Sequence, residues 1–248
     1  IIIGGTFTGV NEDYQINFVK RCLDALNQKD SQNIDEAKII SESSKLKTVG
    51  LTVETKPDFC KQKDIDLMLS YGTTRVELGV QALSDESYRL TNRGHTVQDV
   101  VDSFKLAKDS GLKIVAHMMP GLPGLNYVED LKGFQKLFQD PQFKPDMIKV
   151  YPCLVIEGTA LYGMYMKDLY KPNDESTTIN LLAEVKKIVP KWVRIMRIQR
   201  EIPANSIVAG VKSSNIRQMI LDEVERRGFK CQCIRCREIG LDLSLIHI

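Results

Sequence analysis

The sequence has no long hydrophobic run, few aromatic residues and almost no net charge. No apolar stretch approaches the roughly 20 residues that cross a bilayer, and residues 1–5 lack the basic start and apolar core of a signal peptide. Aromatic residues make up 7% of the chain and the net charge is +2, so a uniformly basic or acidic protein is excluded. These absences predict a cytoplasmic protein without a membrane partner.

Two sequence patterns are also missing. No Gly-x-Gly-x-x-Gly turn follows the first apolar run, which argues against a dinucleotide-binding fold. No repeat of solenoid period and no low-complexity linker occurs. The chain is therefore expected to form ordinary globular structure.

Short β-branched runs alternate with amphipathic stretches of helical length. We expect strands at 1–3, 48–53, 75–80, 113–118, 147–151 and 193–198, and helices at 14–26, 97–108, 130–138, 176–189 and 215–226. Strands that alternate with helices pair in parallel through right-handed crossovers. Six such strands favour a barrel or partial barrel over a doubly wound sheet, so we expect an α/β domain of this kind over residues 1–204.

Polar residues stand at the ends of the predicted strands, where barrel enzymes place their chemistry. Gly4 and Gly5 precede Thr6 and would let a ligand approach the backbone. Glu54 ends the second strand and would point toward the barrel mouth.

The third and fifth strands carry polar faces. Arg75, Glu77, Gly79 and Gln81 share one face of the third strand, and buried polar groups there need a ligand or a partner. A pair of sugar hydroxyls suits Glu77, and an internal salt bridge with Arg75 is the alternative. In the fifth strand, Lys149 and Tyr151 share a face and could meet an acyl or phosphate group.

Positive charge gathers near the C-terminus. Residues 191–237 contain eleven Lys or Arg against four Asp or Glu, although the whole chain is nearly neutral. This distribution suggests a polyanionic partner, or simply a solvated basic face. The candidate RNA-binding residues are Arg194, Arg197, Arg200, Arg226, Arg227, Lys230, Arg235 and Arg237.

Three of the six cysteines crowd together as Cys231, Cys233 and Cys236. Three thiolates on a tight turn suit tetrahedral zinc, which needs a fourth ligand that the sequence does not identify. Three free thiols are the alternative. Residues 203–214 are mostly small and polar, which indicates a domain boundary between the predicted barrel and the cysteines. We therefore predict a linker over 205–242 that contains one helix and the three cysteines. We interpret 243–248 as a sequencing scar.

Several motifs occur in an order that resembles the radical SAM domain of the Elongator complex protein 3 family, in its archaeal type. They are Gly4-Gly-Thr-Phe7, Gly50-Leu-Thr-Val-Glu-Thr-Lys-Pro-Asp58, Arg75-Val-Glu-Leu-Gly-Val-Gln81, Thr91-Asn-Arg-Gly-His-Thr96, Ala116-His-Met-Met-Pro-Gly-Leu-Pro123, Val150-Tyr-Pro152, Ile198-Gln-Arg-Glu-Ile-Pro203 and Cys236-Arg-Glu-Ile-Gly240.

The resemblance implies a radical S-adenosylmethionine (SAM) enzyme, with a partial radical SAM (β/α)6 barrel followed by a small zinc-binding linker. Its [4Fe-4S] cluster and SAM would generate a radical that acts on acetyl-CoA, and the product would carry carboxymethyluridine at the tRNA wobble position. By the same resemblance, Gly4, Gly5 and Thr6 bind the SAM amino group, and Glu77 with Gln81 holds the ribose. Lys149 and Tyr151 would line the catalytic cavity, and the cysteines would form a structural zinc site between two catalytic domains.

The chain departs from the family at both ends. The cluster cysteines of the family precede the Gly-Gly strand, and its acetyltransferase domain follows the Arg-Glu-Ile-Gly run, so we expect the fragment alone to be inactive. The partners implied are the tRNA anticodon region, acetyl-CoA, and Elongator-type subunits or a second copy. Other interpretations are a different radical SAM enzyme such as a porphyrinogen oxidase, a non-catalytic tRNA-docking scaffold, or a protein lysine acetyltransferase whose activity resides in the missing domain.

Overall fold

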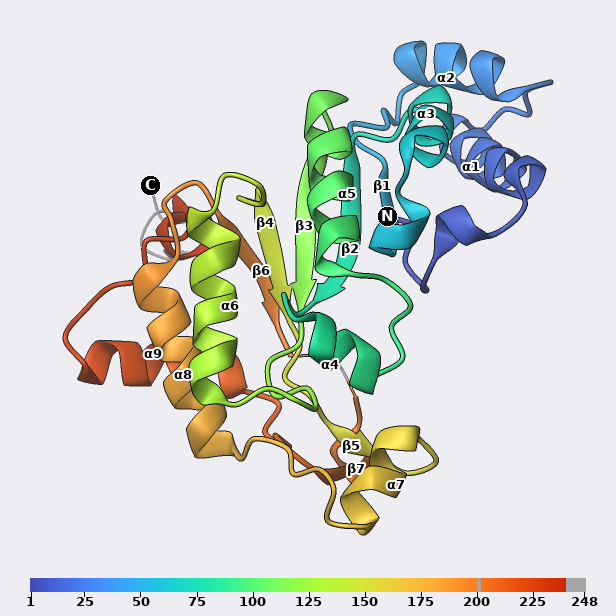
Figure 1. Ribbon diagram of the computed structural model, residues 1–248. Coiled ribbons are helices and arrows are strands. Elements are labelled where there is room, and N and C mark those ends of the chain that lie inside the picture. Colours follow the sequence, from blue (N-terminus) through green and yellow to red (C-terminus); the bar gives the residue numbers. More distant parts are fainter. Residues whose placement is uncertain (200–201, 240–248) are drawn as a thin grey trace. The chain divides into compact units, whose positions relative to one another are not determined.

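The computed structural model describes residues 1–199 and 202–239 (Figure 1). Five strands are hydrogen-bonded in the order β1-β2-β3-β4-β6: β1 (Thr52–Thr55), β2 (Arg75–Gln81), β3 (Lys113–Met118), β4 (Met147–Val150) and β6 (Arg194–Ile198). A separate antiparallel pair joins β5 (Val155–Ile156) to β7 (Ile207–Ala209). Arg200 and the interpreted scar at 243–248 lie outside the described residues.

β1 pairs with β2 in parallel, and β4 pairs with β6 in parallel. Thr52 pairs with Arg75 at the start of β1 and β2, and Met147 pairs with Arg194 at the start of β4 and β6. The expected first strand, 1–3, is reduced to one parallel bridge between Ile2 and Val53. Its flanking residues Ile1 and Ile3 remain exposed, so this run hydrogen-bonds to β1 without forming a strand of its own.

The chain divides into two compact units. The first unit comprises 1–80 and 97–115, and the second comprises 81–96 and the residues from 116 onward. Neither border falls at the predicted division between 204 and 205, which stays a prediction. No helix in the described part of the chain has both the length and the apolar character that crossing a membrane requires.

The first unit contains four helices within the described residues, and two of them begin after asparagine caps. The four helices are α1 (Glu12–Asn27), α2 (Ile34–Ser43), α3 (Gln62–Ser70) and α5 (Val97–Asp109), with 3-10 turns at Phe7–Gly9 and Pro57–Phe59. The side chains of Asn11 and Asn33 accept hydrogen bonds from the first turns of α1 and α2. Apolar residues at helical spacing, such as Val19 and Leu23, are buried.

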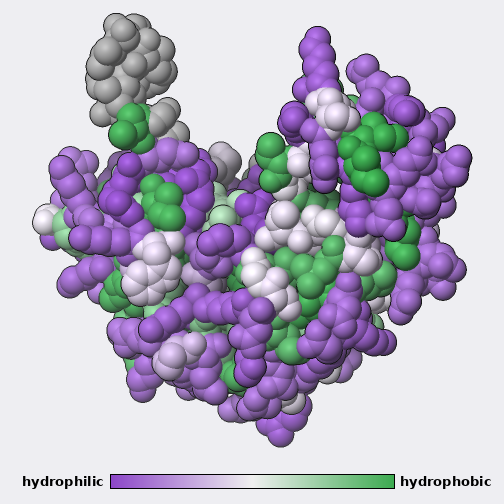
Figure 2. All heavy atoms as spheres, turned by 90° about the horizontal axis from the view of Figure 1, so that it is seen from above, coloured by the Kyte–Doolittle hydropathy of each residue, from purple (hydrophilic) through white to green (hydrophobic). Residues whose placement is uncertain are grey.

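The second unit places α6, α8 and α9 side by side (Figure 1). Its helices are α4 (Asp85–Leu90), α6 (Tyr127–Gln139), α7 (Ala160–Met166), α8 (Glu175–Ile188) and α9 (Ile216–Arg226), with 3-10 turns at Ala204–Ser206 and Ile234–Arg237. Asn126 and Glu129 form a capping box at the start of α6, and Asp174 caps α8. The face seen in Figure 2 is mostly hydrophilic, with hydrophobic residues gathered in a few places.

Candidate functional site

In the first unit, an acidic side chain hydrogen-bonds to the paired glycines, and a second lies in register beside it. Glu54 and Glu77 occupy the same register position on β1 and β2, and both are buried. The backbone N–H of Gly4 donates to Oε2 of Glu54 over 3.1 Å. The structure therefore brings together three of the residues that the sequence predicted for SAM.

The glycine pair leaves its backbone open to a ligand. Gly4 and Gly5 have φ angles of +148° and +116°, and a Cβ atom at either position would meet no atom within 4 Å. Thr6 follows as a half-buried residue whose carbonyl accepts from the N–H of Gly9. These observations fit close approach of a ligand to the peptide groups, which is the contact expected for the amino group of SAM.

In the second unit, backbone hydrogen bonds connect the ends of successive strands. The N–H of Met119 donates to the carbonyl of Gln81 (2.7 Å), and that of Tyr151 donates to Met118 (2.8 Å). The N–H of Gln199 donates to the carbonyl of Val150 (2.7 Å). A continuous rim thus runs from Gln81 to Gln199, and it includes the predicted residue Tyr151.

Two cations lie opposite each other on β4 and β6. The register between these strands shifts after Ile148, which pairs with Ile195, so that Lys149 pairs with Arg197. Without the extra residue, Met196 would stand opposite Lys149, because neighbouring residues alternate between the faces of a strand. Because of this irregularity, Arg197, which was predicted to bind RNA, lies beside Lys149, which was predicted to be catalytic.

An aromatic residue completes this part of the rim. The rings of His117 and Tyr151 meet edge to face, with centroids 5.5 Å apart. Lys149 is 8% exposed, although its side chain is charged. A cationic, partly desolvated surface next to a phenol can bind and orient an anionic group.

Gln81 and Gln199 share an unusual conformation. Their φ angles are +69° and +74°, which are uncommon for residues other than glycine. Each side chain has a buried Oε1 atom without a hydrogen-bond partner among the described residues. Both amides are therefore candidates to accept a hydrogen bond from a ligand.

The turn after β3 is held from two sides. The carboxylate of Asp130 accepts from the N–H of Gly121 (2.7 Å), and the hydroxyl of Tyr170 donates to the carbonyl of Gly121 (2.6 Å). Burial raises the pKa of Asp130 to about 7, although the hydrogen bond from Gly121 acts in the opposite direction. This turn is thus fixed by groups from α6 and from the segment before α8.

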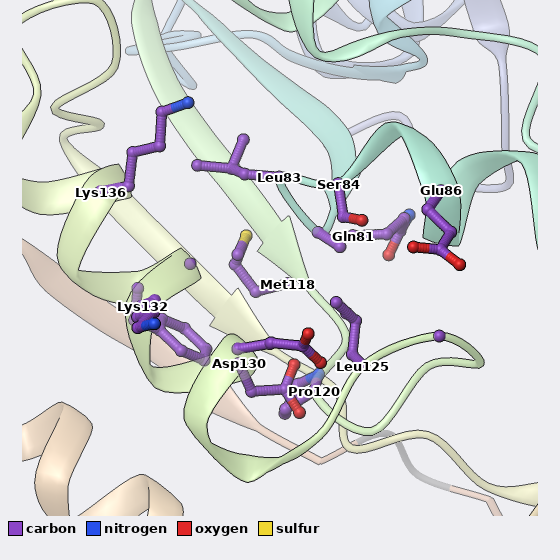
Figure 3. A pocket seen from close by; sticks show the side chains of 15 residues that line it. Gln81, Leu83, Ser84, Glu86, Met118, Pro120, Leu125, Asp130, Lys132 and Lys136 are labelled. Atoms are coloured by element: carbon purple, nitrogen blue, oxygen red, sulfur yellow. The ribbon is translucent and has the colours of Figure 1, made fainter.

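A pocket of about 240 Å³ lies beside this turn. Figure 3 shows Asp130 near Pro120 and Leu125, with Lys132 and Lys136 contributed by α6. Gln81 lines the same pocket together with Met118. Because φ is positive at Gln81, the alternation of β2 ends there, and the predicted ribose contact of Gln81 stays a prediction.

The three clustered cysteines form the only group of His, Cys, Asp or Glu residues suited to a metal within the described ranges. Their sulfur atoms all lie within 4.8 Å of one another. Hydrogen bonds from Cys231 and then Cys236 lower the pKa of Cys233, which favours its thiolate. This donor set fits zinc, and its spacing and position do not fit the radical SAM cluster.

Most of the predicted RNA-binding residues make contacts within the protein. Arg226 and Arg227 donate to Glu223, and Arg194 donates to Glu238. Carbonyl groups accept from Arg235 and Arg237. Lys230 is exposed and Arg200 lies outside the described residues, so an RNA-binding role for this set stays a prediction.

Sequence reasoning did not select several residues of these sites. Gln199 belongs to the motif Ile198-Gln-Arg-Glu-Ile-Pro203 and directly follows the predicted strand 193–198. Its position after a strand end could have marked it as a candidate site residue. Asp130 and Lys186 looked like ordinary polar positions on helices, although both are buried. Asp130 reaches back nine residues to Gly121, and Lys186 contacts Cys236 fifty residues later in the chain. Neither contact can be read from the helical pattern around the residue.

The comparisons with known proteins agree with this geometry. Residues 4–137 match the Radical SAM superfamily, and residues 145–226 match the Radical SAM C-terminal domain. The solved structure of Elp3 from the archaeon Methanocaldococcus infernus, with an N-terminal deletion, has a TM-score of 0.92 and 49% identity over 95% of this chain and 55% of that chain. Coproporphyrinogen III oxidase (HemN) from Escherichia coli, at 19% identity and a TM-score of 0.51 over 74% of this chain and 38% of its own, shares the fold alone. The fold and the matched regions define a radical SAM protein.

Curated relatives narrow the assignment. The tRNA uridine(34) acetyltransferase of Methanocaldococcus infernus is 50% identical over 97% of this chain and 45% of its own length. Elongator complex protein 3 of Homo sapiens is 44% identical over 97% of this chain and 44% of its own length. The chain belongs to the family that these two proteins represent, and it spans less than half of their length.

Proposed function

We propose that the protein containing this chain is a radical SAM enzyme that modifies the wobble uridine of tRNA with an acetyl group from acetyl-CoA. The observation that carries the proposal is the hydrogen bond from Gly4 to Glu54, with Glu77 in register beside it. These residues occupy the motif positions that resemble the SAM site of the family. The similarity to the tRNA uridine(34) acetyltransferase of Methanocaldococcus infernus suggests the substrate.

In this proposal, Gly4, Gly5 and Thr6 present peptide groups to the amino group of SAM. Glu77 accepts hydrogen bonds from the ribose hydroxyls, and Glu54 orients the glycine turn through the N–H of Gly4. When bound, SAM and a [4Fe-4S] cluster supply a one-electron cleavage that starts radical chemistry. No described residue set fits that cluster, so we assign it no ligand in this chain.

The substrates would meet the rim of the second unit. Lys149 and Arg197 form a pair of cationic groups suited to a tRNA phosphate or to another anionic group of a substrate. Tyr151 and His117 would restrict the orientation of the acceptor. The acetyl-CoA site, the Elongator-type partners and a cytoplasmic location follow from the family and belong to the proposal.

The SAM site can be tested in the full-length protein with its cluster reconstituted under anaerobic conditions. Glu77→Gln and Glu54→Gln should each weaken SAM binding by about tenfold, because each loses a charge-assisted hydrogen bond. Glu42→Gln, on the exposed side of α2, is the matched control and should leave the affinity unchanged. Calorimetric titration with SAM measures the effect. Unchanged affinity in both site variants would contradict this placement of SAM.

A further inference from the structure

The cysteine cluster has a fourth neighbour that carries a nitrogen ligand. Nζ of Lys186, in α8, lies 3.5 Å from Sγ of Cys236. Lys186 is 1% exposed. This contact is the only hydrogen bond of its amine with a described residue. The amine is therefore removed from water and directed at the sulfur atom of Cys236.

The distance agrees with the edge of a zinc tetrahedron. Zinc–sulfur bonds of about 2.3 Å and zinc–nitrogen bonds of about 2.0–2.1 Å place a sulfur and a nitrogen ligand about 3.6 Å apart at the tetrahedral angle. No His, Asp or Glu joins the three cysteines within the described ranges. Lys186 thus supplies a nitrogen atom at the distance expected for the fourth corner.

A neighbouring cation would offset the charge of the cluster once zinc is bound. Three thiolates and one zinc ion carry a net charge of −1. The guanidinium of Arg217 interacts electrostatically with all three cysteines and balances that charge. Coordination to the metal would satisfy the amine of Lys186 at its buried position.

We propose that Nζ of Lys186 is the fourth ligand of a zinc ion held by Cys231, Cys233 and Cys236. The inference rests on the zinc site implied for the family. On binding, the amine and the thiols release their protons to solvent, as metal ligands do. The metal would tie α8 to the 231–237 segment, which also hydrogen-bonds to the start of β6 through the N–H of Ile234 and the carbonyl of Val193.

A measurement on the unaltered full-length protein tests the bond directly. Protein labelled with ¹⁵N-lysine and loaded with ¹¹³Cd²⁺ should show one ¹¹³Cd–¹⁵N scalar coupling, and Lys186→Met should abolish it. Lys187→Met is the matched control, because Lys187 is the exposed neighbour on the same helix. A metal bound to three sulfurs without that coupling would overturn the inference and leave the zinc site and the SAM chemistry intact.

Zinc competition with a chromophoric chelator separates a ligand from a charge partner. Lys186→Met and Lys186→Arg should both weaken zinc binding by at least about tenfold, because neither side chain supplies a neutral amine. Full affinity in Lys186→Arg would show that only the positive charge matters and would overturn the inference. Failure of the unaltered protein to bind about one zinc per chain would overturn the site itself, and SAM titration would then show whether the proposed function stands.

Discussion

Lys149 lies directly opposite Arg197 in the parallel register of β4 and β6. The pairing depends on one extra residue in β6, which turns Arg197 to the face of Lys149. Two neighbouring cations repel each other unless an anion or an acidic group offsets their charge. The register thus brings two basic residues together on this part of the rim, which neither strand predicts alone.

Arg197→Gln should weaken tRNA binding in the full-length protein. If Arg197 contacts one phosphate, the slope of log K against log salt should become shallower by roughly 0.7–0.9. Affinity measured at several salt concentrations checks this change. Arg226→Gln is the control, because the guanidinium of Arg226 already binds Glu223 through two hydrogen bonds. The opposite ranking of the two variants would contradict a role for the Lys149–Arg197 pair.

Asp130→Asn should change the pH dependence of stability. A carboxyl whose pKa rises on folding, here to about 7, takes up a proton in the folded state. Its favourable contribution is complete below about pH 4 and is lost as the pH rises through about 7. The asparagine can still accept from Gly121 and does not titrate. Urea unfolding should therefore show a flatter pH profile, with the difference limited to about 4 kcal/mol.

The same unfolding curves provide a control for Asp130. Asp222→Asn, on the exposed side of α9, should keep the pH profile of the unaltered protein, because the carboxylate of Asp222 is exposed and accepts a hydrogen bond from Gln218 at the surface. An Asp130→Asn profile that matches this control would show that Asp130 titrates normally in the folded state.

Arg227→Met should destabilise the packing of α9 on α8. Arg227 donates to Glu223 on its own helix, and to Glu184 and Asn180 on α8, and its side chain is only 23% exposed. Loss of these bonds should lower the free energy of unfolding by about 1–3 kcal/mol. Arg226→Met should change it by less than about 0.5 kcal/mol, because that side chain is 72% exposed. Equal effects in the two variants would contradict a bridging role for Arg227.

Two glycines of the second unit should respond to alanine in opposite directions. Gly124 has a φ of +80°, and a Cβ there would lie 2.7 Å from Cδ1 of Leu90, so Gly124→Ala should destabilise by about 1–3 kcal/mol. Gly133 lies within α6 and a Cβ would meet no atom within 4 Å, so Gly133→Ala should stabilise by about 0.5–1 kcal/mol. Thermal unfolding measures both changes, and a stabilised Gly124→Ala variant would contradict the described turn.

Periodicity predicted the long helices well. α1, α5, α6, α8 and α9 all lie within a few residues of their predicted ranges, because each has a buried apolar stripe of several turns. The shorter α2, α3, α4 and α7 were not predicted, since a stripe of two turns gives little signal. The first predicted strand became a single bridge, because an apolar run does not reveal how many hydrogen bonds its neighbour can form.

The sequence by itself determined the alternation of strands and helices, the family, and the residues that stand at the strand ends. Those features are local, because spacing along the chain decides which side chains share a face. Tertiary structure decided that Arg197 stands opposite Lys149 and that Lys186 reaches Cys236. The first contact depends on strand register and the second on how α8 packs against a segment about fifty residues later in the chain, and neither relationship leaves a pattern in neighbouring residues.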